Sequence, residues 1–304
     1  MFKWLVSQEE VPGIDFQVDN QKIYRYRAET YNHFKINEMH MNRCMNTFVF
    51  EVLVVDKTEE GYVFDWTLKE KEMYKGMEYL GENIIVLEKL ASIKDHLSLL
   101  VNGEGQIIKV LNKEELQTKW NILKENLYEN PEDWPIEEAY KNKFLADGDH
   151  EHSSSFPIED VLNQDPVFST FFFQNTKNKT KSQEDALIRM EQPSNLLMTE
   201  STEKIKIPLI QNTSWQTNID DNEYIDFLIS RNADKARLNK KQMNKLLRNF
   251  PFAEQEIQVY IYDYEAVYKI NGQNYMISEA KYNLLEKVNH DLEVNHTCTI
   301  RAIN

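Results

Sequence analysis

The feature that most constrains the fold is a pair of apolar runs joined by a short polar turn. Residues 48–56 and 62–68 are rich in β-branched and aromatic side chains, and five residues that end in Gly61 separate them. Such side chains favour strands, and glycine accepts the positive φ that a tight turn requires. The pattern therefore predicts an antiparallel hairpin.

The same arrangement recurs along the chain. Runs 97–101 and 106–111 flank a turn that begins with Asn102-Gly103, a pair that supplies positive dihedral angles. Alternating or β-branched stretches predict further strands at 22–27, from 257 to Asn271-Gly272, from 275 to 277, and at 292–303.

Three segments have the spacing of helices. Residues 82–95 place apolar side chains three and four apart, although Ile85-Val86 also suits a strand. Residues 113–128 follow an N-cap pattern at Asn112. Residues 239–250 combine a capping pair with an apolar stripe, and Pro251 ends that helix.

Hairpins dominate, and alternating parallel-sheet units are missing. We therefore expect a β-dominated α+β fold, with one or more antiparallel, meander-like sheets and a few packing helices. Residues 1–128 are predicted to form a β-rich domain that ends in a helix, residues 129–183 an acidic and polar linker with a short apolar segment, and residues 184–304 a C-terminal α+β portion. Whether that portion shares the sheet of the first domain is open.

The charge balance and the lack of targeting signals exclude several partners. Thirty-five basic and 50 acidic side chains give a net charge of −15, which repels nucleic-acid phosphates and anionic lipid. Two cysteines cannot form a disulfide framework, and no export signal is visible. The longest apolar run, 47–55, is far shorter than the ~20 residues of a membrane helix. We expect a cytoplasmic protein that binds neither membranes nor nucleic acid.

The motifs of common active sites are missing, so no catalytic residue and no cofactor are predicted. One dense group of potential metal ligands lies at Asp147, Asp149, His150 and His152. Neighbouring residues of an extended loop point apart, and acidic, serine-rich linkers are common. A solvated linker is therefore the favoured interpretation of this group, and a metal-dependent hydrolase is the alternative.

The most informative charge feature is segment 231–248, in which seven basic residues oppose one acid, Asp234. Its apolar residues form one helical stripe, and several basic residues lie elsewhere on the helix. We predict that this segment binds an acidic partner. The residues assigned to this role are Arg237, Lys241, Lys245 and Arg248. The alternative is that the stripe packs on the core and the lysines are merely solvated.

A complementary acidic loop surrounds Trp134. Glu132 and Asp133 precede this tryptophan, and residues 129–138 contain no basic side chain. An exposed aromatic residue among acids is typical of a protein-docking loop, since tryptophan supplies contact area and charge supplies steering. The alternative is a tryptophan that caps the sheet under a solvated loop. The aromatic row Tyr260, Tyr262 and Tyr264 likewise predicts either a ligand groove or simple packing.

The order of residues 102–116, followed by Trp120 and later by Asp165-Pro166-Val167-Phe168 and Phe171-Phe172-Phe173, resembles that of uncharacterised bacterial proteins. Those proteins sometimes accompany genes for contractile injection (type VI secretion). The resemblance covers mainly residues 97–173, contains no catalytic motif and carries no functional residues across. It implies an accessory or binding role.

We therefore expect a non-enzymatic, cytoplasmic protein-binding or adaptor protein, and the resemblance implies a secretion-system accessory. Its partner is another protein, engaged through the basic helix or the acidic Trp134 loop. Two alternatives stay open. One is a metal-dependent hydrolase that uses residues 147–152, and the other is an acidic, immunity-type inhibitor of a basic toxin.

Overall fold

The computed structural model describes residues 16–19, 22–37, 39–75, 81, 83–172, 188–198, 204–217, 224–248, 254 and 256–303. The described strands are β1 (Tyr24–Ile36), β2 (Met39–Lys57), β3 (Tyr62–Lys75), β4 (His96–Val101), β5 (Ile107–Val110), β6 (Ile188–Met198), β7 (Lys204–Thr217), β8 (Tyr224–Ala233), β9 (Tyr260–Asn271), β10 (Ile277–Val288) and β11 (Leu292–Ile303). The described helices are α1 (Asn83–Ser92), α2 (Lys113–Glu129), the 3-10 helix η2 (Pro131–Asp133), α3 (Glu138–Glu151), α4 (Ile158–Gln164), α5 (Pro166–Phe171) and α6 (Lys240–Leu247).

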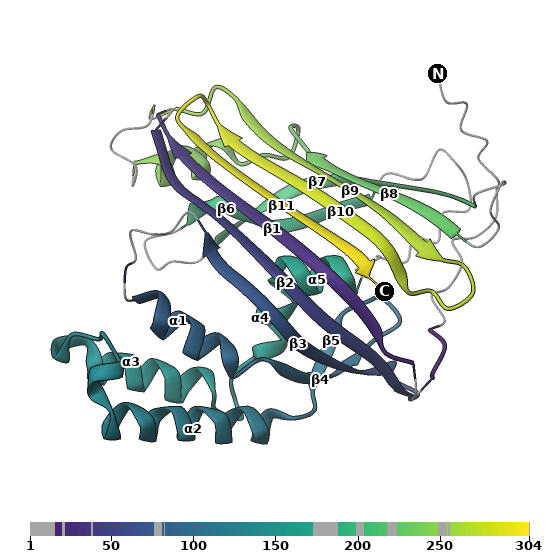
Figure 1. The fold of residues 1–304 in the computed structure, drawn as a ribbon. Helices are drawn as coiled ribbons and strands as arrows, with labels where there is room; N and C mark the ends of the chain where they lie inside the picture. The colour runs from purple at the N-terminus through teal and green to yellow at the C-terminus, as the bar shows by residue number, and fades with distance from the viewer. Residues whose placement is uncertain are drawn as a thin grey trace. The chain divides into compact units, whose positions relative to one another are not determined.

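The eleven described strands form one antiparallel sheet (Figure 1), with the hydrogen-bonded order β5-β4-β3-β2-β1-β11-β10-β9-β8-β7-β6. Apart from the β1–β11 pair, every strand lies beside its neighbour in sequence, so the order is that of a meander. The predicted β-dominated, antiparallel, meander-like fold is confirmed. The three predicted helices are also present as α1, α2 and α6. None of the helices in the described part of the chain has the length and hydropathy of a membrane span.

The chain divides into two compact units. Unit 1 contains the described residues within 29–45 and 176–301, and unit 2 contains those within 16–28, 46–175 and 302–303. β1 and β2 each contribute residues to both units. This division differs from the predicted boundaries at 128 and 184, because the described residues of the expected linker 129–183 form η2, α3, α4 and α5 inside unit 2.

The short apolar segment of the expected linker belongs to the core of unit 2. Phe168, Phe171 and Phe172, in and just after α5, are buried against the aromatic face of β2 and β3. The ring centroids of the pairs Phe50–Phe171, Phe64–Phe172 and Trp66–Phe168 lie 5.5, 5.1 and 5.0 Å apart. These contacts explain why the segment belongs to the core, since aromatic side chains in such a cluster remove large apolar areas from water. The helix itself starts at a cap, because the Asp165 side chain accepts hydrogen bonds from the N–H groups of Val167 and Phe168.

The two hairpins predicted in unit 2, β2–β3 and β4–β5, are both present. Gly61 has φ 154°, and a Cβ atom there would lie 2.0 Å from the carbonyl oxygen of Val101, so β3 and β4 approach too closely for any side chain. In the β4–β5 turn the positive φ falls on Gly105, at 78°, and not on Asn102-Gly103 as expected. The reason is that the Asn102 side chain accepts hydrogen bonds from the N–H groups of Glu104 and Gln106, which makes a longer turn.

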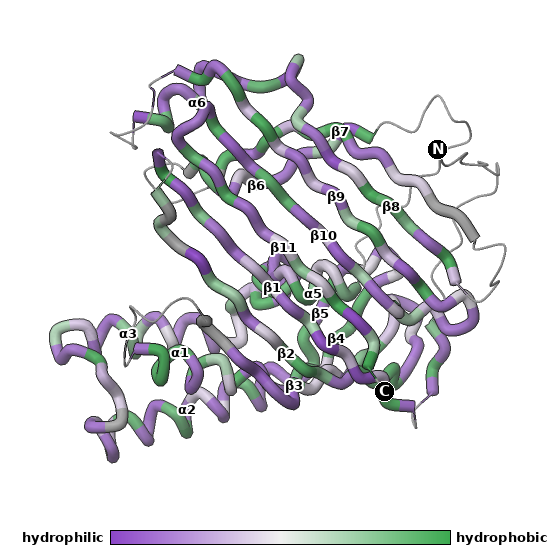
Figure 2. Tube along the Cα trace, turned by 45° about the horizontal axis from the view of Figure 1, so that its top comes forward, coloured by the Kyte–Doolittle hydropathy of each residue, from purple (hydrophilic) through white to green (hydrophobic). Residues whose placement is uncertain are grey.

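The sheet of unit 1 has one buried face. Along β9, β10 and β11 the even-numbered residues are mainly buried and most odd-numbered residues are more exposed. Hydrophobic and hydrophilic residues are interspersed along these strands (Figure 2). Antiparallel pairing places Arg231 of β8 opposite Tyr264 of β9, and Tyr264 opposite Leu284 of β10. This face, the inner face, therefore carries both apolar and polar side chains.

Candidate functional site

Helix α6 presents a basic surface on unit 1. The side chain of Asn239 accepts a hydrogen bond from the N–H of Gln242 at 3.1 Å, which caps the first turn as predicted. Met243, Leu246 and Leu247 are buried, so the helix is anchored by one face. We define the basic surface as the exposed cations of the turn before α6, of α6 itself and of its C-cap: Lys235, Arg237, Lys240, Lys241, Lys245 and Arg248.

The charges of the basic surface are almost unneutralised. Arg237 lies 3.9 Å from a carboxylate oxygen of Glu191, and both side chains are about half exposed, so this pair contributes little. Within the described part of the chain, the other five cations have no carboxylate within 4 Å. Asp234, the one acid of the segment, is buried and lies 3.7 Å from Arg189. The acidic residues that the structure describes thus do not pair with these lysines.

Trp134 is not an exposed docking residue. Its side chain is only 4% exposed, and its indole Nε1–H donates a 3.1 Å hydrogen bond to the side-chain oxygen of Asn126. The ammonium of Lys89 lies 4.4 Å from the centre of the ring. The premise of an exposed aromatic is therefore wrong, because α1 and α2 supply partners for both the face and the edge of the indole. Glu132 is exposed, and the side chain of Asp133 lies outside the described atoms.

The predicted metal ligands lie near the C-terminal end of α3 and do not converge. Asp149 accepts hydrogen bonds from Trp120 Nε1 at 2.8 Å and from Lys124 Nζ at 2.6 Å, and the Lys124 bond is the larger cause of its lowered pKa. Asp147 and His150 are exposed, and His152 is buried. Among the described residues no group of three or more His, Cys, Asp or Glu side chains is placed to hold a metal ion. The predicted metal site is therefore wrong, since Asp149 is already bonded to Trp120 and Lys124 and no described group of ligands converges there.

His152, the C-cap residue of α3, packs against α2. Its ring centroid lies 5.4 Å from that of Trp120, and its Nδ1 atom is buried without a hydrogen-bond partner. Gly148 makes this packing possible, because a Cβ atom there would lie 2.3 Å from the Trp120 ring. Burial, and then the positive charge of Lys94, lowers the pKa of His152 from 6.5 to about 4.

We expect His152 to make unit 2 sensitive to acid. A histidine that is neutral in the folded state gains protons on unfolding, so stability is lost as the pH falls from 6.5 toward 4, by about 2 kcal/mol. The variant His152→Phe keeps the ring contact and should lack this loss in urea unfolding followed by circular dichroism. His150→Phe, which changes an exposed histidine of the same helix, is the control. An unchanged acid dependence in His152→Phe would contradict the assignment.

A buried carboxyl group that was not predicted lies in unit 1. Glu286 of β10 is 0% exposed and accepts hydrogen bonds from Ser194 Oγ at 2.5 Å, Tyr260 Oη at 2.8 Å and the N–H of Asn195 at 2.6 Å. β6 is four places from β10 in the sheet order, so the sheet of unit 1 curves until β6 reaches β10. Burial raises the pKa of Glu286, and the three hydrogen bonds oppose that rise only in part.

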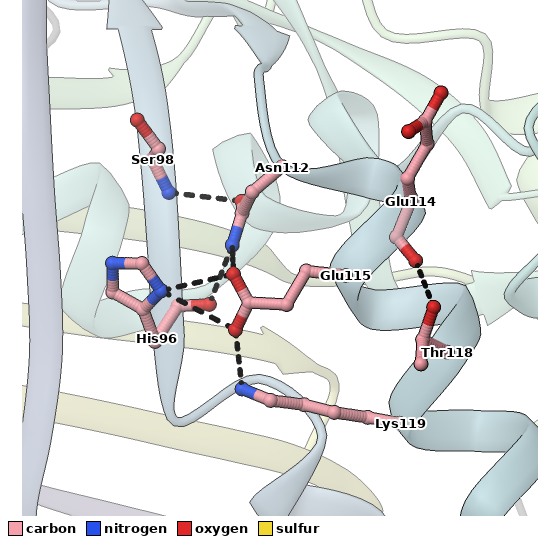
Figure 3. A network of polar contacts seen from close by, with 7 residues as sticks. All are labelled: His96, Ser98, Asn112, Glu114, Glu115, Thr118 and Lys119. Carbon is pink, nitrogen blue, oxygen red and sulfur yellow. Dashed lines mark hydrogen bonds and ion pairs between the residues drawn. The ribbon is translucent and has the colours of Figure 1, made fainter.

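A second polar network joins α2 to β4 in unit 2. Figure 3 shows the carboxylate of Glu115 between His96 Nδ1 at 3.2 Å, Asn112 Nδ2 at 3.0 Å and Lys119 Nζ at 2.8 Å. Hydrogen bonds from Asn112 and then Lys119 lower the pKa of Glu115 to about 2. The Asn112 side chain accepts from the N–H of Ser98 and does not cap α2. The network therefore fixes the start of α2 to the sheet, and we assign it no catalytic role.

Comparison with known proteins identifies no family. No protein-family model matches the chain, and no curated protein matches its sequence. The chain is similar to a solved structure described as "Lipid-protein interactions in lipovitellin", with a TM-score of 0.47 and 8% identity over 95% of this chain. It spans about a quarter of the length of that protein, since the match covers 26% of it. The match assigns neither family nor function, and the link with contractile injection systems stays a prediction.

Proposed function

We propose that this chain is a protein-binding or adaptor protein that docks onto an acidic surface of another protein through the basic surface of α6. The observation that carries this proposal is the concentration of exposed cations without carboxylate partners among the described residues, in a chain of net charge −15. Unpaired surface charges steer association with a complementary partner and set its orientation.

The position of the cations also supports a protein partner. The apolar face of α6 is buried, so the helix is anchored to the folded domain and the spatial arrangement of its lysines is fixed. A compact acidic patch on a protein can approach these cations to within the screening length, which is ~10 Å at moderate salt, so that the attraction between them persists. A long polyanion such as nucleic acid would also meet the negative remainder of the chain, which repels it.

The triple variant Lys241→Glu, Lys245→Glu, Arg248→Glu is expected to lose its protein partner while keeping its fold. These side chains are exposed, so their replacement leaves the buried stripe of α6 intact. The measurement is affinity purification from the native source at low and high salt, with mass spectrometry of the bound proteins. Circular dichroism and the melting temperature of the variant check its fold.

A matched control changes the charge equally at other exposed lysines. Lys109→Glu, Lys143→Glu, Lys281→Glu makes the same charge reversal on β5, α3 and β10. A partner that the control retains and the α6 variant loses supports the proposal. Retention of the same proteins by both variants would contradict it, and would favour binding through the acidic remainder of the surface, as in an inhibitor of a basic toxin.

A further inference from the structure

Arg231 of β8 is a cation that has no counter-charge in the described part of the chain. It is half-buried on the inner face of unit 1, and its Nε–H donates a 2.7 Å hydrogen bond to the side-chain oxygen of Gln211. Its guanidinium carbon lies 4.6 Å from the centre of the Tyr264 ring. No described carboxylate lies within 4 Å of it, although it belongs to the same basic segment as α6.

The donors of Arg231 that remain form a fork. Arginine carries five N–H groups in one plane, and the Nε group alone is bonded to a described acceptor. Among the described residues, the buried side-chain N and O atoms that lack a partner belong to Trp66, His152 and Asn295, so the terminal nitrogens of Arg231 are not sealed from solvent. Two parallel N–H groups in a fork match the geometry of a carboxylate or a phosphate.

The surroundings of the fork are neutral and aromatic. Tyr264 of β9 lies between Arg231 of β8 and Tyr282 of β10, and the two tyrosine rings stack with centroids 5.6 Å apart. Burial raises the pKa of Tyr264 and Tyr268, so both phenols stay protonated. Glu286, the buried acid of this face, bonds with Ser194, Asn195 and Tyr260 and leaves the cation unpaired.

A guanidinium stays charged at every physiological pH, and partial removal of its hydration without a counter-charge is unfavourable. A bound anion would compensate for that cost. We propose that Arg231 binds the carboxylate or phosphate group of a small organic anion, whose apolar or aromatic part contacts the tyrosines of the inner face. This binding role is separate from the docking of a protein on α6.

The test is calorimetric titration of the full chain with phenyl phosphate, phenylbutyrate and inorganic phosphate. Wild type is expected to bind at least one of the two organic anions, and the one it prefers identifies the phosphate or carboxylate class. Arg231→Met should weaken that binding by about 30-fold or more, because one partner of a shielded charge pair is removed. Arg231→Lys, which keeps the charge but not the fork, should show an intermediate loss.

Arg301→Met is the matched control, because it removes an exposed arginine of β11 that pairs with Glu279. Its affinity for the probes should equal that of wild type. Circular dichroism checks the fold of each variant, and Arg231→Lys decides the question if Arg231→Met does not fold. Binding of neither organic anion by wild type, or equal binding by folded Arg231 variants, would overturn the proposal. If wild type bound inorganic phosphate as tightly as the organic anions, the proposed contact between the tyrosines and the apolar part of the ligand would be refuted.

Discussion

Replacement of Glu286 by alanine is expected to lower the free energy of unfolding by about 3 kcal/mol, because it leaves two buried donors and one half-buried donor without an acceptor. These donors are the hydroxyls of Ser194 and Tyr260 and the N–H of Asn195. Their lost hydrogen bonds outweigh the relief gained from removing a buried carboxyl. Urea unfolding followed by circular dichroism measures the change.

Glu279→Ala is the control for this experiment, since Glu279 lies on the same strand in an exposed pair with Arg301. Its effect should stay within about 0.5 kcal/mol. Equal stability of the two variants would contradict the role of Glu286.

The contribution of Glu286 to stability depends on pH with a defined sign. Because the folded-state pKa of Glu286 is raised above 4.5, its stabilising contribution is full below 4.5 and is lost as the pH rises through the folded-state value.

Gly61→Ala is expected to destabilise unit 2 by about 3 kcal/mol or more. The added Cβ would lie 2.0 Å from the carbonyl oxygen of Val101 and 2.9 Å from the Cα of Asn102. Both are backbone atoms, so β3 and β4 must separate, although Tyr62 and Val101 are paired there. A fall in the melting temperature, read by circular dichroism, measures the effect.

Gly103→Ala provides a comparison in the adjoining turn. Gly103 is exposed and does not have a positive φ, so alanine there should change the stability by less than about 1 kcal/mol. If Gly61→Ala were tolerated as well as Gly103→Ala, the close approach of β3 and β4 would be refuted.

The hairpins of the fold were predictable because their signals are local. The runs that became β2 and β3 are rich in β-branched and aromatic residues, and the turn between them ends in Gly61. β6 and β7 escaped prediction because Pro193 and Pro208 interrupt their patterns. Proline lacks the donor that a central strand requires, so sequence reasoning excludes such segments until their partners are known.

The candidate site was predictable only where its partners are close in sequence. The cap and stripe of α6 lie within one short helix, and both predictions are confirmed. The docking interpretation of Trp134 is wrong, and the alternative of a packed tryptophan agrees with its burial. Its acidic neighbours indicate exposure, whereas its burial involves Lys89 and Asn126 from other helices. Glu286 and Ser194 are 92 positions apart, and the only local signal was an acid at a buried register position of β10.

The course of β1 and β2 through both units limits how the chain can be divided into contiguous segments. Residues 29–45 belong to unit 1, whereas the residues on either side of that stretch belong to unit 2. Neither unit is one continuous segment of the polypeptide, so neither can be transferred as a single uninterrupted stretch of its gene. A contiguous segment that carries unit 2 from residue 16 to residue 175 also carries residues 29–45, which belong to unit 1.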